Sequence, residues 1–400
     1  MKTQCCIAGG GPAGIMLGFL LARSGVDVVV LEKWPDFFRD FRGDTIHPST
    51  MRLLRELGLL DEFLKLPHNE TKQVALHFGE ESVVVADFTH LNVPCPFLGF
   101  IPQWDFLNFL ASKAKQYPSF HLLMETEAIG LIEEGGRVVG VRAKEKDGEI
   151  EIRADLVIGA DGRHSTIREQ SKIPVFDSGA PIDVLWFSVP RVDDGTGQSL
   201  GYIDKGRMMV LLDRDSYWQC AHIIHKGDLE KIKVRGLEAF RNDIAEVVPL
   251  LKSAVVEIKS WDQVKLLSVA VDHLETWHRP GLLCIGDSAH AMSPIGGVGI
   301  NLAVQDAVAA ANVLIPAFGR GVTEKDLAAI QLRREPPARY IQRFQVFAHT
   351  HIIEPILQNP SRRSVPLALK FFNWLPVLRR IPAYVIGIGW RSEHIRTDIK

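Results

Sequence analysis

Two glycine-rich stretches, far apart in the chain, carry the residue types that bind an anionic ligand through backbone groups. Residues 9–14 read GGGPAG, which fits the spacing G-x-G-x-x-G. Residues 281–307 run from a short apolar strand through Gly286-Asp287 and Pro294 into further glycines and a helix. Glycines let a ligand approach the backbone closely, and N–H groups at a helix N-terminus favour negative charge. We therefore expect one ligand that is long enough to touch both stretches.

The first stretch lies inside a complete β–α–β pattern. Residues 4–8 form an apolar strand, residues 15–24 a helix of apolar and small residues, and residues 26–31 a β-branched strand. Glu32 follows 18 residues after Gly14, where an acid can accept both hydroxyls of an adenosine ribose. This combination predicts nucleotide binding. The alternative is a glycine-rich turn with a merely solvated Glu32.

The composition excludes several classes of protein. Hydrophobic residues make up 46% and charged residues 24% of the chain, and the formal net charge of −2 gives no electrostatic case for nucleic acid. The five cysteines have no metal-type spacing, so we expect reduced thiols and no metal site. The sequence begins as a strand rather than a signal peptide, and no apolar run reaches the length of about 18 residues that a spanning helix needs. We expect a cytoplasmic enzyme.

The residue composition and pattern of the chain change after Pro181. Short strands rich in Trp, Phe, Met and Val follow, and from Val304 onward the chain is mostly helical. Two earlier strands around Gly79 have the same character as the later strands, so we assign them to the same sheet. The expected parts are a discontinuous nucleotide-binding domain (residues 1–72, 97–180 and 273–335), a sheet domain (residues 73–96 and 181–272) and a C-terminal helical segment (residues 336–400).

Three motifs in this order resemble one family. They are GGGPAG with Glu32, IGADGRHSTIR at residues 158–168, and GLLCIGDSAHAMSPIGGVGIN at residues 281–301. Together they resemble the class A flavoprotein aromatic hydroxylases, typified by para-hydroxybenzoate hydroxylase and including the ubiquinone-biosynthesis hydroxylases. The resemblance covers about residues 1–350. It implies an α/β fold, with a three-layer FAD/NAD(P)-binding domain of the glutathione-reductase type, an inserted and mainly antiparallel β-sheet domain for the substrate, and a helical C-terminus.

The resemblance also implies how FAD is bound. The first loop would hold the pyrophosphate, Asp287 the ribityl hydroxyls, and the second loop the isoalloxazine ring, with a side-chain donor from Asn301. The family often has glutamine where this chain has Val298. The residues expected to bind FAD are Gly9, Gly11, Ala13, Gly14, Glu32, Lys33, Arg42, Gln103, Ala128, Asp161, Arg163, Asp287, Gly296, Gly297, Val298, Gly299, Ile300 and Asn301.

The reaction implied by the resemblance needs no protein nucleophile. NADPH or NADH would reduce FAD, and oxygen would then form a flavin C4a-hydroperoxide that hydroxylates an electron-rich substrate. Pro294 would lie beside the flavin edge where oxygen reacts. His47 and His222 are candidate proton acceptors, because histidine titrates near neutral pH. For each histidine the alternative is a structural role.

We expect the substrate to lie against the inserted sheet on the Pro294 side. Strand alternation puts Met209 and Leu211 on one face of the sheet but does not say which face points at the flavin. A core role for the apolar candidates is therefore the alternative. No arginine pair suited to a carboxylate is evident, which favours a neutral, lipophilic aromatic or polyketide-like substrate. The candidate substrate residues are Trp186, Met209, Leu211, Trp218 and Gln219.

The C-terminal stretch is basic and aromatic. Residues 365–390 mix Leu, Phe, Trp and Ile with Arg379 and Arg380, and three prolines argue against one long helix. Two interpretations stay open. The stretch packs across the FAD domain or a subunit partner, or it lies on an anionic membrane surface. The expected assembly is a monomer or a homodimer.

Other functions are weighed on the same motifs. A plain NAD-dependent dehydrogenase explains residues 9–32 but not residues 281–301. A disulfide reductase needs a Cys-x4-Cys pair that the sequence lacks, and WFSVP at residues 186–190 does not match the halogenase signature W-x-W-x-I-P. A reductase of a prenyl-type double bond and a non-catalytic flavin-binding protein remain as alternatives.

Overall fold

The computed structural model describes residues 1–38, 44–192, 200–214, 216–359 and 365–396. Its first sheet has a core of parallel strands in the order β20-β11-β1-β2-β8, with β19 and a β9–β10 meander added at antiparallel edges. Residues Cys5–Ala8 of β1 are fully buried, as expected for a strand covered on both faces. The bounds are β1 Lys2–Ala8, β2 Val28–Leu31, β8 Phe120–Leu123, β9 Glu127–Glu134, β10 Arg137–Glu145, β11 Gly148–Gly159, β19 His278–Arg279 and β20 Leu282–Cys284.

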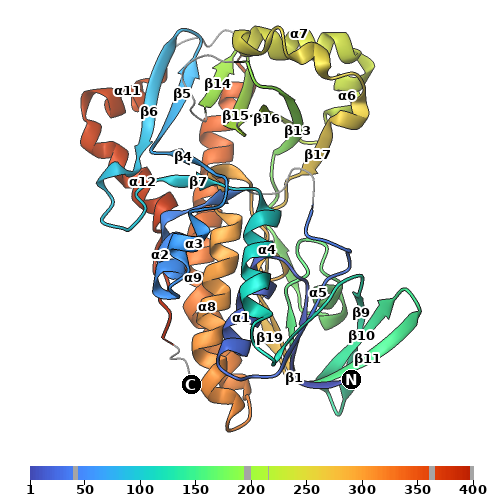
Figure 1. Ribbon diagram of the computed structural model, residues 1–400. Coiled ribbons are helices and arrows are strands. Elements are labelled where there is room, and N and C mark those ends of the chain that lie inside the picture. The colour runs from blue at the N-terminus through green and yellow to red at the C-terminus, as the bar shows by residue number, and fades with distance from the viewer. Residues whose placement is uncertain (39–43, 193–199, 215, 360–364, 397–400) are drawn as a thin grey trace.

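Three helices pack together against this sheet (Figure 1). Helix α1 begins with Pro12 at its first position, where the missing proline N–H costs nothing. A Cβ on Gly18 would lie 2.7 Å from Val30 Cγ2, so α1 packs closely on β2. The helix α8 is buried along most of its length. The bounds are α1 Pro12–Arg23, α4 Gln103–Ala114 and α8 Gly299–Phe318, and α5 (Thr166–Ser171) contacts β9 on the other side.

A second, mostly antiparallel sheet has seven strands in the order β17-β13-β16-β15-β14-β5-β6. Helices α6 and α7 cover its outer face at the top of Figure 1. The early strands β5 and β6 join this sheet because β5 pairs in parallel with β14. The bounds are β5 Gln73–Phe78, β6 Glu81–Asp87, β13 Ile182–Pro190, β14 Leu200–Asp204, β15 Arg207–Asp213, β16 Tyr217–His225, β17 Lys265–Ser268, α6 Leu229–Val234 and α7 Leu237–Val247.

Smaller elements join the two sheets. A three-stranded sheet has the order β3-β7-β4, and β12 pairs with β18. Two short helices, α2 and α3, follow β3 along the chain. The bounds are β3 Thr45–Ile46, β4 Asn69–Thr71, β7 Leu98–Phe100, β12 Val175–Asp177, β18 Asp272–Leu274, α2 Pro48–Glu56 and α3 Leu60–Phe63.

The C-terminal part is helical. Helix α9 packs along α8, whereas α11 and α12 pack on β6. Among the described residues, one helical segment, Ile295–Phe318, is long and apolar enough to cross a bilayer, but 72% of that window is buried inside the fold. It is therefore the core helix of this domain. The bounds are α9 Glu324–Ala348, α10 Glu354–Leu357, α11 Leu367–Trp374, the short 3-10 helix η8 Pro376–Arg379, and α12 Arg380–Gly387.

The expected α/β architecture, with an inserted antiparallel sheet and a helical C-terminus, is the one that the structure has. Two local breaks shape the sheet domain. Helices α6 and α7 are separated at Gly236, whose φ is +91°. Strand β17 begins only at Lys265, because Trp261–Gln263 form a 3-10 turn closed by a capping box from Ser260.

Candidate functional site

The first glycine loop is tight because a side chain does not fit inside it. Gly9 has a φ of +108°, and a Cβ there would lie 2.3 Å from the carbonyl oxygen of Ala160. A Cβ on Gly14 would lie 1.9 Å from the Gly9 carbonyl oxygen. In contrast, a Cβ on Gly11 would meet nothing within 4 Å, so this side of the α1 N-terminus is open. The loop thus presents the start of a helix to an anionic ligand.

Glu32 closes the far side of this loop. It follows β2 directly, is 9% exposed, and accepts a hydrogen bond from the Gly10 backbone N–H at 3.2 Å. The neighbouring Lys33 lies 3.9 Å from the Glu127 carboxylate, and Ala128 is the next residue of β9. The residues expected around the adenosine therefore lie together, although they come from separate strands.

The second motif meets the first at Gly286. This residue has a φ of +63°, and a Cβ there would lie 3.3 Å from Ala13 Cβ and 3.4 Å from Ala303 Cβ. Gly286 is thus wedged between the starts of α1 and α8. Its backbone N–H donates to the buried carboxylate of Asp306 at 3.1 Å. Two motifs that are far apart in the sequence meet at this point.

Asp287 and Asp161 have different surroundings. The Arg163 Nε donates to Asp287 Oδ2 at 3.1 Å, and both side chains are partly exposed, at 22% and 28%. Asp161 instead accepts from Ser165 Oγ and from the Ile167 N–H within its own loop, and burial raises its pKa. The carboxylate of Asp287 is therefore the more accessible of the two, whereas Asp161 shapes the loop that carries Arg163.

The loop before α8 offers backbone rather than side chains. Gly296 and Gly297 have φ values of +78° and +61°, which favour glycine. Val298 and Ile300 are 5% and 7% exposed, so their side chains face the core. Helix α8 begins at Gly299, where a Cβ would meet nothing within 4 Å. This helix N-terminus suits a ligand edge that carries partial negative charge.

The side chain of Asn301 does not serve as the expected donor to the flavin. Its amide nitrogen donates to the Thr45 carbonyl at 3.0 Å and to the Gly297 carbonyl at 3.3 Å. Its oxygen accepts from the His47 N–H at 2.8 Å and from Thr50 Oγ1 at 2.7 Å. All four hydrogen-bonding positions are used within the protein, so Asn301 fixes the loop against β3 and α2, and only its backbone is left for a ligand.

Helix α9 positions the Pro294 loop through two glutamines that sequence reasoning missed. The Gln345 amide donates to the carbonyl groups on both sides of Pro294, at 2.9 and 3.0 Å. Gln342 donates to the Ala291 carbonyl at 2.8 Å. Both glutamines are nearly fully buried. In the sequence they are two polar residues in a long helix, and nothing there says that a loop some fifty residues earlier lies against them.

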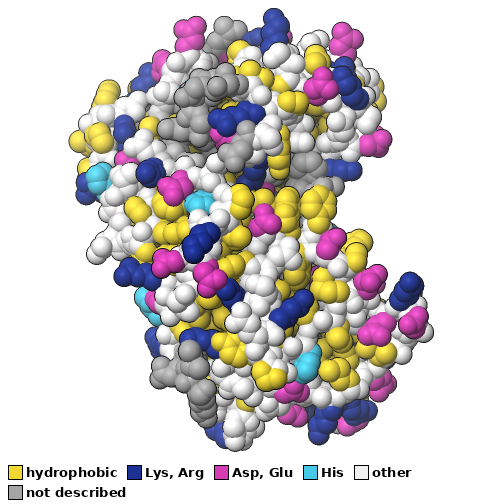
Figure 2. All heavy atoms as spheres, viewed as in Figure 1, with side chains coloured by type: hydrophobic (Ala, Val, Ile, Leu, Met, Phe, Trp, Pro, Cys, Tyr) yellow, Lys and Arg dark blue, Asp and Glu magenta, His cyan; other side chains and the backbone are white. Residues whose placement is uncertain are grey.

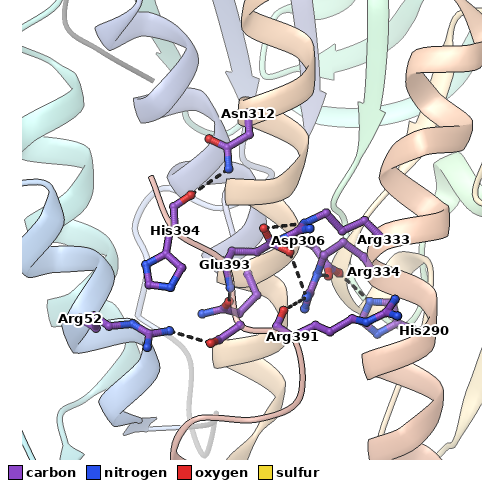
Figure 3. Close-up of polar contacts among 11 residues, drawn as sticks. Arg52, His290, Asp306, Asn312, Arg333, Arg334, Arg391, Glu393 and His394 are labelled. Atoms are coloured by element: carbon purple, nitrogen blue, oxygen red, sulfur yellow. Dashed lines mark hydrogen bonds and ion pairs between the residues drawn. The ribbon is translucent and has the colours of Figure 1, made fainter. Parts of the chain in front are cut away.

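A buried ionic network supports the second motif from behind (Figure 3). Asp306 contacts His290 Nε2 at 2.6 Å and Arg334 Nε at 2.9 Å. Arg334 lies 3.5 Å from Glu393 of the C-terminal tail, which also pairs with Arg333 at 2.7 Å. Burial raises the pKa of Asp306, but His290 and Arg334 outweigh it, so the net shift of the pKa is downward. His290 is therefore a structural partner of Asp306.

His47 lines a small cavity of about 30 Å³ between the second glycine loop and α12. It is 0% exposed, and its Nδ1 donates to the Ile386 carbonyl of α12 at 2.7 Å. Burial lowers its pKa to about 4, so the imidazole is neutral at neutral pH. The His47 backbone N–H donates to Asn301, and its imidazole lies beside the backbone of Gly296 and Gly297. Its Nε2 is buried and has no partner among the described residues. That His47 accepts a substrate proton stays a prediction.

Three candidate substrate residues and one candidate proton acceptor lie on the face of the second sheet that α7 covers. Met209, Leu211 and Trp218 are 0% exposed and belong to the apolar cluster that α7 covers. His222 has the same orientation, with its ring 5.9 Å from that of Phe240 on α7, and burial lowers its pKa to about 4. Strand alternation grouped these residues correctly, but it carries no information on which face meets the first domain. They form the outer core of the sheet domain.

Two substrate candidates lie on the face toward the loop. Trp186 packs in the apolar cluster that also contains Ile295, the residue after Pro294. Gln219 is 4% exposed and accepts from Arg214 Nε at 3.0 Å.

A buried ion pair next to Gln219 was missed in the sequence. Arg214 forms an ion pair with Asp44, and Asp44 also accepts from the Gln103 N–H at 3.2 Å. Burial raises the pKa of Asp44 to about 6, and Arg214 opposes that rise. The Arg214 Nη1 is buried and has no partner among the described residues. The two side chains are 170 residues apart, so only the fold reveals the pair. Arg42, expected near the FAD phosphates, lies outside the described residues.

Comparison with known proteins assigns the family. Residues 2–343 match the family model of the FAD binding domain. A 6-methylpretetramide 4-monooxygenase of Streptomyces rimosus is 35% identical over 408 residues, covering 99% of this chain and 95% of that protein.

The chain belongs to the FAD-dependent aromatic hydroxylases.

Solved structures agree on the fold of this hydroxylase. The p-nitrophenol 4-monooxygenase PnpA of Pseudomonas putida DLL-E4 superimposes with a TM-score of 0.80 at 20% identity, covering 98% of this chain and 100% of that chain. OxyS anhydrotetracycline hydroxylase of Streptomyces rimosus gives a TM-score of 0.77 at 21% identity, covering 97% of this chain and 76% of that chain.

The residues of the hydroxylase fit FAD. The α1 N-terminus is open at Gly11 for a pyrophosphate, and Glu32 stands beside the loop for a ribose. Asp287 is a partly exposed carboxylate that can accept hydroxyl hydrogen bonds, and the α8 N-terminus follows at Gly299. Gly286 joins the two ends. One extended dinucleotide matches this row of groups better than two separate ligands.

Proposed function

We propose that this enzyme hydroxylates a neutral, lipophilic aromatic or polyketide-type substrate, using NADPH or NADH and oxygen. The substrate would lie between the Pro294 loop and the sheet face that carries Trp186. The observation that supports this most is the apolar cluster shared by that face and Ile295. The relative from Streptomyces rimosus is itself a monooxygenase of 6-methylpretetramide, which is consistent with such a substrate.

The protein's own groups have distinct roles in this proposal. FAD, once bound, supplies the hydride acceptor and the oxygen-activating centre. The two glycine loops, Glu32 and Asp287 bind and orient it. Gln345 fixes the carbonyl groups around Pro294, so that this loop holds one shape beside the ring. The apolar face with Trp186 orients the substrate and excludes water, which keeps the reactive centre from being lost to side reactions.

Arg214 is the proposed polar contact of the substrate. Its Nη1 is a buried donor without a partner among the described residues, and a buried donor is normally satisfied by protein, water or a ligand. Asp44 neutralises the guanidinium charge. The pair therefore suits an uncharged carbonyl or a phenolic oxygen better than a carboxylate. Asp44 immediately precedes Thr45, whose carbonyl accepts a hydrogen bond from Asn301. The ion pair therefore lies close to the loop that is proposed to hold the flavin.

The experiment is a substrate screen under air that follows NADPH and NADH oxidation together with product mass. The proposal expects a lipophilic phenol or polyketide to stimulate oxidation and to gain the mass of one oxygen atom. Stimulated oxidation that yields only hydrogen peroxide for every such compound would contradict it. A reduced double bond formed without oxygen would instead indicate a reductase.

A further inference from the structure

Exposed apolar side chains concentrate on the C-terminal helices. On α11, η8 and α12 they form what we call the α11–α12 face. Figure 2 shows hydrophobic side chains gathered over α11 at its upper left edge. A soluble surface usually carries such residues singly rather than side by side. The members and their exposed fractions are Leu367 76%, Phe371 48%, Trp374 68%, Leu375 51%, Val377 57%, Ile381 61% and Tyr384 56%.

The inner side of this segment packs on the sheet domain, so its exposed apolar side chains belong to helices that are fixed to the fold. Leu369 and Phe372 of α11 pack against the apolar cluster around Phe78. On α12, a Cβ at Gly387 would lie 3.2 Å from the ring of Phe88, which shows how closely the helix approaches the sheet domain. The helices are therefore amphipathic: one side completes the core of the protein and the other is apolar and exposed.

The outward residues follow helical spacing. Leu367, Phe371 and Trp374 are separated by four and three positions, which places them on one face of α11. The rings of Phe371 and Trp374 lie 5.4 Å apart. Ile381 and Tyr384 are likewise three positions apart on α12. The pattern is that of a continuous apolar stripe with an aromatic pair, not of scattered exposed residues.

The exposed charge that the segment itself carries has one sign. Arg380 is exposed and has no ion-pair partner among the described residues, and Arg379 is used only in hydrogen bonds with Phe372 and Asn373. Lys370 is paired with Glu81 of β6 at 3.4 Å. Within residues 365–396 the acidic side chain is Glu393, which is 0% exposed. The exposed charge of this segment is therefore positive.

We propose that the α11–α12 face lies on an anionic lipid bilayer. An apolar stripe with Trp and Tyr, bordered by arginine and with no exposed acid in its own segment, matches the interface between headgroups and acyl chains. The neighbouring acid, Glu81, is paired with Lys370. Each cation near an anionic surface adds attraction that salt screens. A second copy of the chain fits less well, because a two-fold interface would pair this positively charged face with itself.

The α11–α12 face lies close to the loop where the substrate is proposed to bind. Ile386 of α12 accepts the hydrogen bond of His47, and a Cβ on Gly296 would lie 3.9 Å from Ile386 Cγ1. The lipid-facing helix is thus in contact with the loop beside which the substrate is proposed to lie. A docked enzyme would take a lipophilic substrate from the bilayer rather than from water. This consequence rests on the proposed function, whereas the docking itself does not.

The test is flotation of the FAD-loaded full chain with vesicles of phosphatidylcholine alone or mixed with phosphatidylglycerol. The wild type is expected to float with the anionic vesicles and to detach as salt rises. Trp374→Glu should weaken the partition by about tenfold or more, because a charge replaces an aromatic side chain that enters the bilayer in this proposal. Arg380→Glu should weaken binding to anionic vesicles alone. Leu332→Glu is the matched control, since Leu332 is 75% exposed on α9 outside the face.

Flotation is read without turnover, so failure of the hydroxylation screen leaves this result standing. Retained flavin and an unchanged unfolding transition show that the variants are folded. The proposal is overturned if the wild type ignores anionic vesicles or if Trp374→Glu floats as the wild type does. It is also overturned if the wild type sediments as a dimer that Trp374→Glu separates, since the face is then a subunit interface.

Discussion

Asp306→Asn tests whether the buried network supports the flavin motif. Asp306 is 0% exposed and joins three donors: His290, Arg334 and the Gly286 N–H. The asparagine keeps the shape but removes the charge and turns one oxygen into a donor. Arg334, 1% exposed, would keep only Glu393 at 3.5 Å as a charged partner. Breaking a buried ion pair in this way costs about 3–5 kcal/mol of unfolding free energy.

The assay is urea unfolding of the apoprotein, followed by titration with FAD. We expect the free energy of unfolding to fall by that amount, and the Kd for FAD to rise about tenfold, because Gly286 loses a charged acceptor. Asp228→Asn is the control: its ion pair with the exposed Lys231 should contribute about 1 kcal/mol or less. If Asp306→Asn unfolds at the wild-type urea concentration and binds FAD equally well, the network has no supporting role.

Three further predictions follow from single contacts. Gln345→Leu removes both hydrogen bonds around Pro294, so we expect more hydrogen peroxide per NAD(P)H oxidised with little change in flavin content, measured with a peroxide assay. The double variant Arg214→Met with Asp44→Asn leaves no unpaired buried charge and should raise the KM for substrate about tenfold; an unchanged KM would remove Arg214 from the site. The folded-state pKa of His222 lies near 4, below its ordinary 6.5, so its stabilisation is complete above pH 6.5 and is lost as pH falls toward 4. Between pH 7.5 and 5 the stability of the wild type should therefore fall by about 2 kcal/mol more than that of His222→Phe, and parallel pH curves would contradict this.

The motifs predicted the parts of the site that backbone geometry defines. A glycine with a positive φ, an acid after a strand and a proline before a helix leave local signals, as at Gly9, Glu32 and Pro294. The order of these motifs also resembled one family, which the comparisons confirm. Such signals are short-range, because each depends on a few consecutive residues.

The predictions that failed, and the contacts that were missed, depend on packing between segments that are distant in the sequence. Alternation grouped Met209 with Leu211 but left open which face of the sheet carries them, and the packing of α7 decides that question. The pairing of Arg214 with Asp44 and the hold of Gln345 on the Pro294 loop join segments distant in the chain. Asn301 was assigned a ligand role from its motif, whereas its four hydrogen bonds serve the protein.

One FAD that spans both glycine loops is tested most directly by the flavin content of purified Asp287→Ala. The wild type should be yellow, with about one FAD per chain, because the family binds one dinucleotide across this site. The variant should lose most of its FAD, since the partly exposed carboxylate between the two loops is the proposed acceptor for the ribityl hydroxyls. Asp177→Ala, an exposed aspartate on β12, should keep its flavin. Full and tight FAD in Asp287→Ala would contradict this assignment of the second motif.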